Sequence, residues 1–220
     1  MDSLLGGGVR TGMLTDVYGP SGSGKSQLCF SLCANCVRNG ETAIFVDTAG
    51  TFRPERIAEI SGSLGSLEKI KFVRALNTID QVNTVGKMLD AGSRLVIFDT
   101  LTSLYSAEYN GPARHLAVMK HLHELAIAAI NTGCALVVTN MVRNIPMTVV
   151  DKAARNISQT VVPSQQREYL GSSVSIYSHI KIKLEIIDAA KSLFQATLVQ
   201  PPRKDPVLFA ITSRGLSDPN

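Results

Sequence analysis

Short apolar runs alternate with longer amphipathic stretches over the first 140 residues of the chain. The clearest run is Leu-Val-Ile-Phe at 95–98, which ends at Asp99, and another covers 135–138. Continuous apolar runs of this length are typical of parallel strands that helices cover on both faces. We predict strands over 13–18, 42–46, 70–74, 94–99 and 135–140, and helices over 25–38, 54–60, 79–91 and 113–131. This alternation predicts an α/β fold with a doubly wound, mostly parallel sheet.

The pattern changes after position 140. Residues 141–171 are polar and poorly periodic, so we predict a long loop of the kind that usually has a function. Strand-like stretches follow at 173–177, 180–187, 193–200 and 207–212, with a turn at Pro201-Pro202. We interpret these strands as an antiparallel C-terminal extension at the edge of the sheet, which leaves 1–220 as a single domain.

Composition narrows the class of protein. The 220 residues are 45% hydrophobic and 18% charged, which suits a packed globular domain rather than a disordered chain. The net charge of +4 permits an anionic partner such as nucleic acid but does not require one. No apolar run reaches the ~18 residues of a membrane span, and the N-terminus lacks a signal-peptide pattern, so we expect no membrane partner.

The cysteines have two interpretations. Cys29, Cys33 and Cys36 lie on one face of the predicted helix 25–38, because their spacing is i, i+4, i+7. Together with Cys134 they could hold a metal ion. We favour the alternative that they pack as small apolar residues against the sheet, and we expect a reducing, cytoplasmic compartment.

A glycine-rich segment follows the first predicted strand. It consists of Gly19, Pro20, Ser21, Gly22, Ser23, Gly24, Lys25 and Ser26, and it matches G-x-x-x-x-G-K-[ST] without a mismatch. Glycines let backbone N–H groups converge on the dense charge of a triphosphate, and the helix that begins here adds its positive N-terminal end. We predict that these residues bind ATP, that Lys25 reaches the β- and γ-phosphates, and that Ser26 ligates Mg²⁺.

A second acidic group should complete the magnesium site, and Asp99 is the candidate. It ends the apolar run 95–98, so it lies at the carboxyl edge of the sheet, where ligands of open α/β sheets bind. The alternative is that Asp99 only caps the next turn with Thr100. Because a phosphate-binding loop lies upstream, we predict that Asp99 and Ser26 share the metal ion and that Lys25 and Asp99 are the catalytic residues.

Several segments carry a family resemblance. The segment 46–56 reads Val-Asp-Thr-Ala-Gly-Thr-Phe-Arg-Pro-Glu-Arg and is similar to a RadA signature across nearly its whole length. Other matching segments are 2–12, 25–29, 113–116, 121–122, 137–140, 209–211 and 215–218. Together they resemble the ATPase core of RecA/RadA-type recombinases and imply a RecA-like P-loop NTPase over nearly the whole chain. The resemblance adds Gln27 and Arg56 to the cofactor-binding residues. It implies that Arg56 stacks on adenine; a solvated helix arginine is the alternative.

The chain departs from that family at positions that matter for hydrolysis. Position 49 is alanine where the family has its catalytic glutamate, and position 141 is methionine where it has a glutamine that links the γ-phosphate to a DNA loop. We also expect a short first DNA loop at 103–112 and no N-terminal helix-hairpin-helix domain or filament linker. These departures resemble an archaeal RadB-like paralogue, an accessory factor in recombination and DNA repair. A positioned acid–base group typically contributes ~10²–10⁴-fold, so we expect ATP binding with slow hydrolysis.

The predicted loop 141–171 corresponds to the second DNA loop of that family. It holds Arg143, Lys152, Arg155 and Arg167, and the resemblance implies that they bind single-stranded DNA weakly and in a salt-sensitive manner. A solvated loop without DNA contacts is the alternative. The resemblance implies a RadA-type recombinase or another paralogue as protein partner. An alternative function is a KaiC-like ATP-dependent regulator with protein partners instead of DNA, and the sequence leaves the oligomeric state open.

Overall fold

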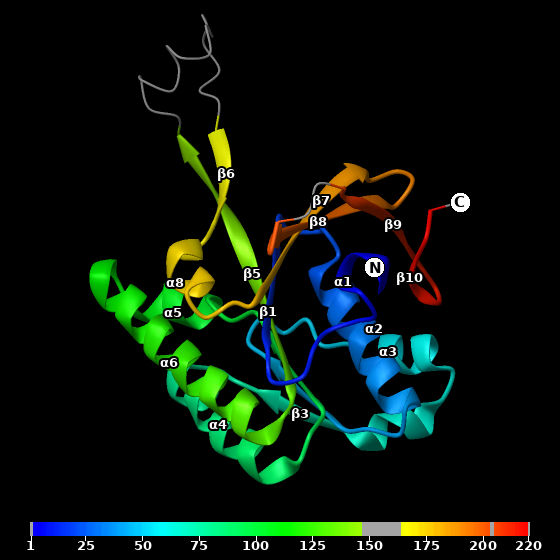
Figure 1. Cartoon of the computed structure of the whole chain (residues 1–220), viewed down its shortest axis with the longest axis horizontal. Coiled ribbons are helices and arrows are strands. Elements are labelled where there is room, and N and C mark those ends of the chain that lie inside the picture. Colours follow the sequence, from blue (N-terminus) through cyan, green and yellow to red (C-terminus); the bar gives the residue numbers. More distant parts are fainter. Residues whose placement is uncertain (1, 147–163, 203–204, 220) are drawn as a thin grey trace, which may run out of the picture.

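The computed structural model describes residues 2–146, 164–202 and 205–219. They form one ten-stranded sheet with helices on both faces (Figure 1). The strand order is β10-β9-β8-β7-β1-β5-β4-β2-β3, and β6 pairs with β5 off this path. The strands are β1 Leu14–Gly19, β2 Ala43–Asp47, β3 Ile70–Arg74, β4 Leu95–Asp99, β5 Ala135–Pro146, β6 Ser164–Glu168, β7 Ile180–Asp188, β8 Leu193–Gln200, β9 Val207–Thr212 and β10 Gly215–Ser217.

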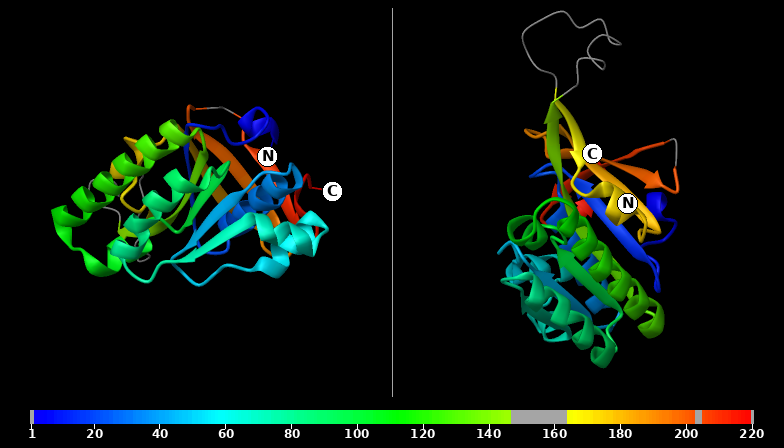
Figure 2. Two further views of the ribbon diagram at one scale, coloured as in Figure 1. Left: turned by 90° about the horizontal axis from the view of Figure 1, so that it is seen from below. Right: turned by 90° about the vertical axis from the view of Figure 1, so that its left-hand side faces the viewer.

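Helices cover the two faces of the sheet, as Figure 2 shows from two further directions. On one face lie α2, α3 and the 3-10 helix η1, and on the other lie α4, α5, α6 and α8. The helices are α1 Asp2–Leu5, α2 Lys25–Arg38, α3 Pro54–Ser61, η1 Leu64–Lys69, α4 Thr78–Ala91, α5 Ser103–Glu108, α6 Gly111–Thr132 and α8 Gly171–Ser175. The predicted doubly wound α/β architecture is therefore confirmed.

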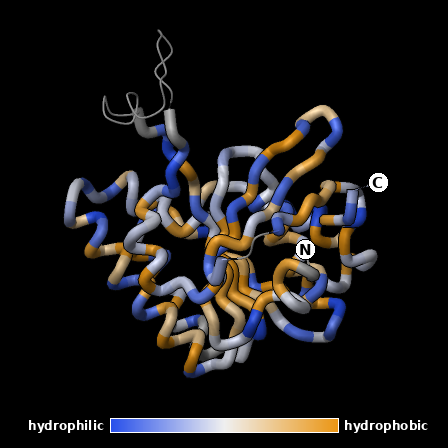
Figure 3. Tube along the Cα trace, turned by 45° about the horizontal axis from the view of Figure 1, so that its top comes forward, coloured by the Kyte–Doolittle hydropathy of each residue, from blue (hydrophilic) through white to orange (hydrophobic). Residues whose placement is uncertain are grey.

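The central parallel strands are apolar on both faces because each face has its own helical cover. In β2, Phe45 packs with the side chains of α2, whereas Ile44 and Val46 pack with those of α6. In β4, Ile97 and Phe98 divide between the two faces in the same way. Figure 3 shows the hydrophobic residues gathered along these strands. The continuous apolar runs of the sequence thus predicted strands that are buried on both faces.

The C-terminal strands extend the sheet as predicted. β7 runs parallel to β1, and β8, β9 and β10 then pair antiparallel one after another. Pro201 and Pro202 form the turn after β8. Because β5 and β7 flank β1, the loop that follows β1 lies in the middle of the sheet. The glycine-rich segment is therefore surrounded by the ends of other strands.

The expected long loop at 141–171 is in part a two-stranded ribbon, so that prediction was wrong for its described residues. β5 continues to Pro146 and pairs antiparallel with β6, which ends at Glu168. The ribbon formed by the outer part of β5 and by β6 projects from the body of the molecule (Figure 1). Its partner residues are far apart in the sequence and mostly polar, so no alternation of apolar and polar positions indicated the two strands.

Two short helices replace other expected elements. The segment 103–112, expected to be a loop, holds α5 and the start of α6. The segment 173–177, predicted as a strand, overlaps α8, where the Ser175 hydroxyl donates a 2.6 Å hydrogen bond to the Gly171 carbonyl. Helices of five or six residues are too short to show a 3.6-residue period, so periodicity could not predict them.

The predicted packing of the cysteines is confirmed. Cys29 and Cys33 are fully buried beneath α2 with the apolar core, and Cys36 lies at the edge of the same cluster. Burial raises the pKa of Cys36 to about 11, which keeps its thiol protonated and poorly reactive at neutral pH. Within the part of the chain that the structure describes, no helix is long and apolar enough to cross a membrane.

Candidate nucleotide-binding site

The glycine-rich segment forms a tight turn between β1 and α2. Gly24, the N-cap residue of α2, has a φ of 93°, a conformation that residues with a side chain rarely adopt. At Gly19 the constraint is space instead, because a Cβ there would lie 2.3 Å from the carbonyl oxygen of Leu184 on β7. Glycine at these two positions therefore lets the turn adopt its backbone conformation and pack closely against β7.

Lys25 is folded over this loop. Its Nζ donates hydrogen bonds of 2.9 Å to the carbonyl of Gly19 and 2.8 Å to that of Pro20. Burial lowers the pKa of Lys25, and the nearby Asp99 carboxylate opposes that shift. The ammonium is thus half-buried, held by neutral carbonyls, and able to exchange them for the stronger attraction of phosphate oxygens.

Asp99, at the end of β4, accepts hydrogen bonds from three hydroxyl groups. Ser26 Oγ donates to Oδ2 at 2.6 Å, Thr51 Oγ1 to the same oxygen at 3.2 Å, and Thr139 Oγ1 to Oδ1 at 2.5 Å. Asp99 is 2% exposed. The structure therefore brings the predicted metal ligands Ser26 and Asp99 together, and a hydroxyl beside a carboxylate is a suitable set of oxygen donors for Mg²⁺.

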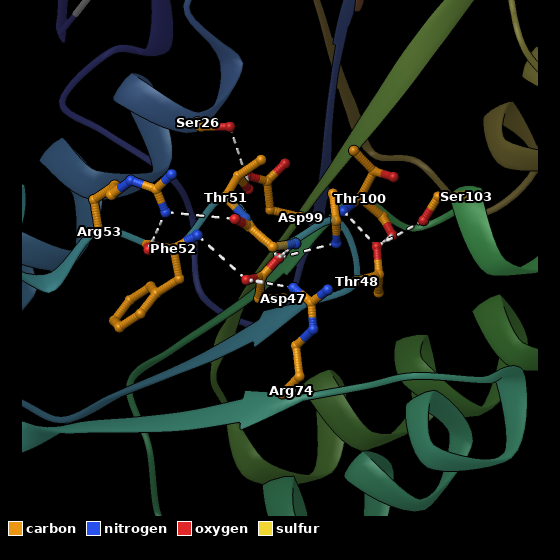
Figure 4. Close-up of polar contacts among 12 residues, drawn as sticks. Ser26, Asp47, Thr48, Thr51, Phe52, Arg53, Arg74, Asp99, Thr100 and Ser103 are labelled. Carbon is orange, nitrogen blue, oxygen red and sulfur yellow. Dashed lines mark hydrogen bonds and ion pairs between the residues drawn. The ribbon is translucent and has the colours of Figure 1, made fainter.

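Asp47, at the end of β2, organises the turn that follows it. Its Oδ1 accepts hydrogen bonds from the backbone N–H groups of Ala49, Gly50 and Thr51 at 2.7–3.2 Å. Its Oδ2 accepts a hydrogen bond from the backbone N–H group of Phe52 and forms a 2.8 Å ion pair with Arg74 (Figure 4). Burial alone would raise the pKa of Asp47, but these backbone donors outweigh it and lower the pKa.

A cavity of about 530 Å³ opens in front of the glycine-rich turn. Its volume lies within the range of ~300–1,000 Å³ that is usual for small-molecule sites. The predicted residues in its wall are Ser21, Gly22, Gly24, Lys25, Ser26, Gln27 and Asp99. Gly19, Pro20 and Ser23 are not in the wall, and Ser23 is buried beneath the turn. The cavity and its donors therefore fit a magnesium nucleotide.

Two further residues of the wall are Ala49 and Met141. Asp47 fixes the backbone at Ala49, so its exposed methyl group faces the cavity from the turn after β2. Met141 belongs to β5, beside Gly19 in the parallel pairing with β1. Neither side chain offers a carboxylate, an amide or a hydroxyl to a water molecule in the cavity.

Arg56 lies next to the cavity rather than in its wall. Its Nε donates a 3.0 Å hydrogen bond to Oε1 of Gln27, and its guanidinium also binds the carbonyls of Thr212 and Ser213. A 2.6 Å ion pair joins it to Glu59. Arg56 is thus not a freely solvated helix arginine but connects α3 with the turn between β9 and β10.

The predicted DNA contacts lie partly on the ribbon. Arg143 on β5 and Arg167 on β6 occupy directly opposite positions of the antiparallel pair, and both are exposed. The Arg143 guanidinium stacks 3.8 Å from the ring centre of Tyr169 and donates a 2.8 Å hydrogen bond to Ser106 Oγ on α5. Lys152 and Arg155 lie outside the described residues.

A buried charge network that the sequence did not predict holds the foot of the ribbon. Lys181 Nζ lies 2.5 Å from Oε2 of Glu168 and 3.2 Å from Oδ2 of Asp16. Asn140 Nδ2 donates a 3.0 Å hydrogen bond to Oε1 of Glu168. Burial raises the pKa of Asp16, as does Glu168, whereas Lys181 lowers it. These partners are dispersed along the chain, so no spacing in the sequence signals them.

Fold and site together define the class of protein. A mostly parallel sheet with a glycine-rich turn after its central strand, and a carboxylate at the end of a strand two places away, is the RecA-like class of P-loop proteins. Residues 1–218 match the Rad51 family. The chain belongs to the Rad51 family. This family is an ATPase family whose named members are DNA repair and recombination proteins.

Individual relatives support this assignment. DNA repair protein RAD51 homolog B of Zea mays is 35% identical over 161 residues, which cover 64% of this chain and 47% of that protein. RadA of Metallosphaera sedula is 36% identical over 162 residues, 64% of this chain and 50% of that protein. RadA of Ignicoccus hospitalis is 30% identical over an alignment 245 positions long, which covers all of this chain and 71% of that protein. The chain thus matches about half the length of the first two relatives.

Proposed function

We propose that the chain binds Mg-ATP in the cavity before the glycine-rich turn and hydrolyses it slowly. The backbone N–H groups of the turn residues in the wall, Ser21, Gly22, Gly24, Lys25 and Ser26, hold the phosphates together with the Lys25 ammonium. Ser26 and Asp99 provide the oxygen ligands for the metal ion, and their 2.6 Å separation supports that role. Gln27 in the wall and Arg56 behind it form the end of the site where the base binds.

The observation that carries the proposal is the chemical character of Ala49 and Met141 in the wall of the cavity. A water molecule that attacks the γ-phosphate needs a group that orients it or accepts its proton. Asp47 cannot take over that role, because its oxygens already hold the turn and Arg74. Among the described residues, the site therefore retains its phosphate and metal ligands but has no carboxylate at position 49 and no amide at position 141 to orient the attacking water.

We further propose that the ribbon binds single-stranded DNA. Arg143 and Arg167 occupy opposite positions of the antiparallel pair, and both are exposed. Basic groups that follow an exposed ribbon suit contact with the phosphates of a single strand. The Tyr169 ring beneath Arg143 restrains that guanidinium at the foot of the ribbon.

Slow hydrolysis together with weak DNA binding suits an accessory member of the family. We propose that the chain is a RadB-like paralogue that assists a RadA-type recombinase, or another paralogue, in homologous recombination and DNA repair. We also propose that residues 1–220 act as one domain, since the described strands share a single sheet.

The test measures ATP affinity by calorimetry, and turnover by phosphate release, with and without a single-stranded oligonucleotide. The native chain should bind Mg-ATP with little turnover, and Lys25→Ala should abolish detectable binding. DNA binding should weaken steeply as the salt concentration rises. Rapid turnover that survives Lys25→Ala would contradict the proposal. Nucleotide binding without any DNA binding at low salt would favour a regulator with protein partners instead.

A further inference from the structure

The buried charge network at the foot of the ribbon holds two carboxyl groups and one ammonium group. Asp16 lies on β1, Glu168 ends β6 and Lys181 lies on β7. Their side chains are 0%, 9% and 4% exposed, respectively. With all three groups ionised, the network would carry one uncompensated negative charge, and burial of such a charge is strongly unfavourable. The nucleotide site described above uses none of these groups.

Lys181 is bound more closely to Glu168 than to Asp16. Its Nζ lies 2.5 Å from Oε2 of Glu168 but 3.2 Å from Oδ2 of Asp16. Glu168 also accepts a 3.0 Å hydrogen bond from Asn140 Nδ2. Asp16 has no hydrogen-bond partner among the described residues apart from Lys181 and Glu168. Asp16 is therefore the carboxyl group that is less able to remain ionised.

Direct contact between Asp16 and Glu168 requires a proton. Burial raises the pKa of Asp16, and Glu168 raises it further through its charge and through a side-chain hydrogen bond, although Lys181 lowers it. An ionised carboxylate only accepts hydrogen bonds, so a hydrogen bond between two carboxyl groups needs a proton on one of them. A pair of carboxyl groups in one site accordingly holds one proton between them.

We propose that Asp16 carries a proton in the folded chain, donates it in a hydrogen bond to Glu168, and loosens the foot of the ribbon when this proton is lost. The O–H bond of Asp16 then breaks, the proton passes to water, and a second carboxylate forms beside Lys181. This carboxylate repels Glu168 and competes with it for the ammonium group. The proton itself does not depend on the function proposed above; only its effect on DNA affinity rests on that function.

Glu168 transmits this change to the ribbon. It ends β6 and precedes Tyr169, whose ring centre lies 3.8 Å from the Arg143 guanidinium. Asn140 Nδ2 donates hydrogen bonds both to Oε1 of Glu168, at 3.0 Å, and to the carbonyl of Tyr169, at 2.7 Å. A displacement of Glu168 would therefore move the tyrosine on which Arg143 stacks, and with it one of the two arginines that we expect to contact DNA.

The other titratable groups of this network do not replace Asp16 in its role. Tyr18 lies two positions further along β1, and its ring centre is 5.4 Å from Lys181 Nζ. Burial, together with the charges of nearby carboxylates, raises the pKa of Tyr18 to about 12, so its hydroxyl stays protonated at neutral pH. The helix α8 contributes the uncharged Ser175, whose Oγ accepts a 2.7 Å hydrogen bond from Lys181.

Two histidines lie on segments next to the network. Nδ1 of His115 on α6 is 2.8 Å from Ser173 Oγ on α8. Nδ1 of His179, immediately before β7, accepts a 3.1 Å hydrogen bond from the backbone N–H group of Leu14. Among the described residues, Glu168 and Lys181 are the charged groups that shift the pKa of Asp16. Replacement of Asp16 alone therefore separates its titration from that of a histidine near pH ~6.5.

The first experiment observes the proton. The carboxyl carbon of Asp16, assigned through the backbone of the native chain, is followed by carbon NMR with labelled aspartate from pH ~4 to pH ~9. Because its pKa lies well above the ordinary value, this carboxyl group should still be protonated at pH ~6 and should lose its proton as the pH rises further. A pKa near ~3.9, or a carboxyl group that stays protonated up to pH ~9, would overturn the proposal.

The second experiment observes the ribbon. Hydrogen exchange gives protection factors for the paired amides of β5 and β6, corrected for the intrinsic effect of pH. In the native chain they should fall about tenfold as Asp16 loses its proton, the effect of weakening one charged hydrogen bond. Asp16→Asn, whose amide donates at every pH, should remove this fall, whereas Asp205→Asn at an exposed position should retain it. Equal pH dependence in the native chain and Asp16→Asn would contradict the proposal.

A third measurement follows DNA binding over the same pH interval by fluorescence anisotropy with a single-stranded oligonucleotide. The affinity of the native chain should fall about tenfold as the pH rises, and that of Asp16→Asn should fall much less. The expected exchange result without DNA binding at any pH would support the proton site and contradict the DNA role of the ribbon. A loss of affinity of the same size in both proteins would contradict the control of DNA binding by Asp16.

Discussion

The hydroxyl of Ser26 donates a 2.6 Å hydrogen bond to Oδ2 of Asp99, although the two residues are 73 positions apart. Ser26 lies in the first turn of α2, and Asp99 ends β4, which β5 separates from β1. The contact therefore depends on the order of the strands and not on any local motif. It places the two proposed metal ligands where one ion can contact both.

The metal role of Asp99 predicts a variant effect that depends on magnesium. Asp99→Asn keeps the size of the side chain but removes its charge, so it should reduce the gain in ATP affinity that Mg²⁺ provides by about tenfold or more, or ~1.4 kcal/mol. Calorimetry with ATP in the presence of Mg²⁺ and in the presence of EDTA measures this gain. Affinity in EDTA should change little, and an equal loss in both buffers would indicate a structural role for Asp99 instead.

The turn after β2 predicts a stability effect with a defined pH dependence. Asp47→Asn should lower the free energy of unfolding by about 1.5–3 kcal/mol at pH 7, the range for hydrogen bonds to a charged group. The folded-state pKa of Asp47 lies below its ordinary value. Its stabilisation is therefore complete above the unfolded pKa of ~3.9 and is lost as the pH falls through the folded pKa.

Urea denaturation of the native chain and Asp47→Asn, repeated from pH 7 downward, measures this dependence. The difference between the two proteins should shrink below pH ~3.9. Asp205→Asn, at an exposed position, is the matched control and should stay within about 0.5 kcal/mol of the native chain. A difference that remains constant over the whole range would show that the charge of Asp47 is not what holds the turn.

The arginine pair on the ribbon predicts a change in salt dependence. Each phosphate neutralised on a single strand contributes a slope of about 0.7 to the plot of log affinity against log salt. Replacing both Arg143 and Arg167 by alanine should therefore reduce the slope by about 1.4, as measured by fluorescence anisotropy with an oligonucleotide. The double variant Lys87→Ala/Lys191→Ala removes two exposed charges elsewhere and should not change it. An unchanged slope in the ribbon variant would exclude these arginines as phosphate contacts.

The sequence predicted the elements whose signal is local. The helix Lys25–Arg38 has the predicted bounds because glycines at 24 and 40 mark its ends directly. The strand Ile70–Arg74 also has the predicted bounds, although it is a partly exposed strand at the edge of the sheet. The ribbon strands were missed because they pair with residues distant in the sequence, and α5 and α8 were missed because they are too short to show a helical period. Contacts with residues elsewhere in the chain determine the structure of such segments, and the periodicity of the sequence carries no information on those contacts.

The candidate site, too, has residues that local sequence patterns predict and residues that they do not. The glycine-rich turn and Asp99 have recognisable local patterns, and the structure brings them together around one cavity. The hydroxyls of Thr51 and Thr139, which also bind Asp99, were not predicted. Threonine is common in strands and turns for other reasons, so its presence there indicates no particular function. Only the pairing of β4 with β5 places Thr139 within reach of that carboxylate.

The central claim is that the nucleotide site binds ATP but lacks the group that activates water at position 49. A single-turnover experiment with radiolabelled ATP and excess protein measures bound ATP and ADP in the same sample over time. For the native chain, nearly all of the bound nucleotide should remain ATP, whereas Ala49→Glu should convert it at least ~100-fold faster and the uncharged control Ala49→Gln should not. Conversion in the native chain as fast as in Ala49→Glu, or no retained nucleotide in any of the three proteins, would contradict the account.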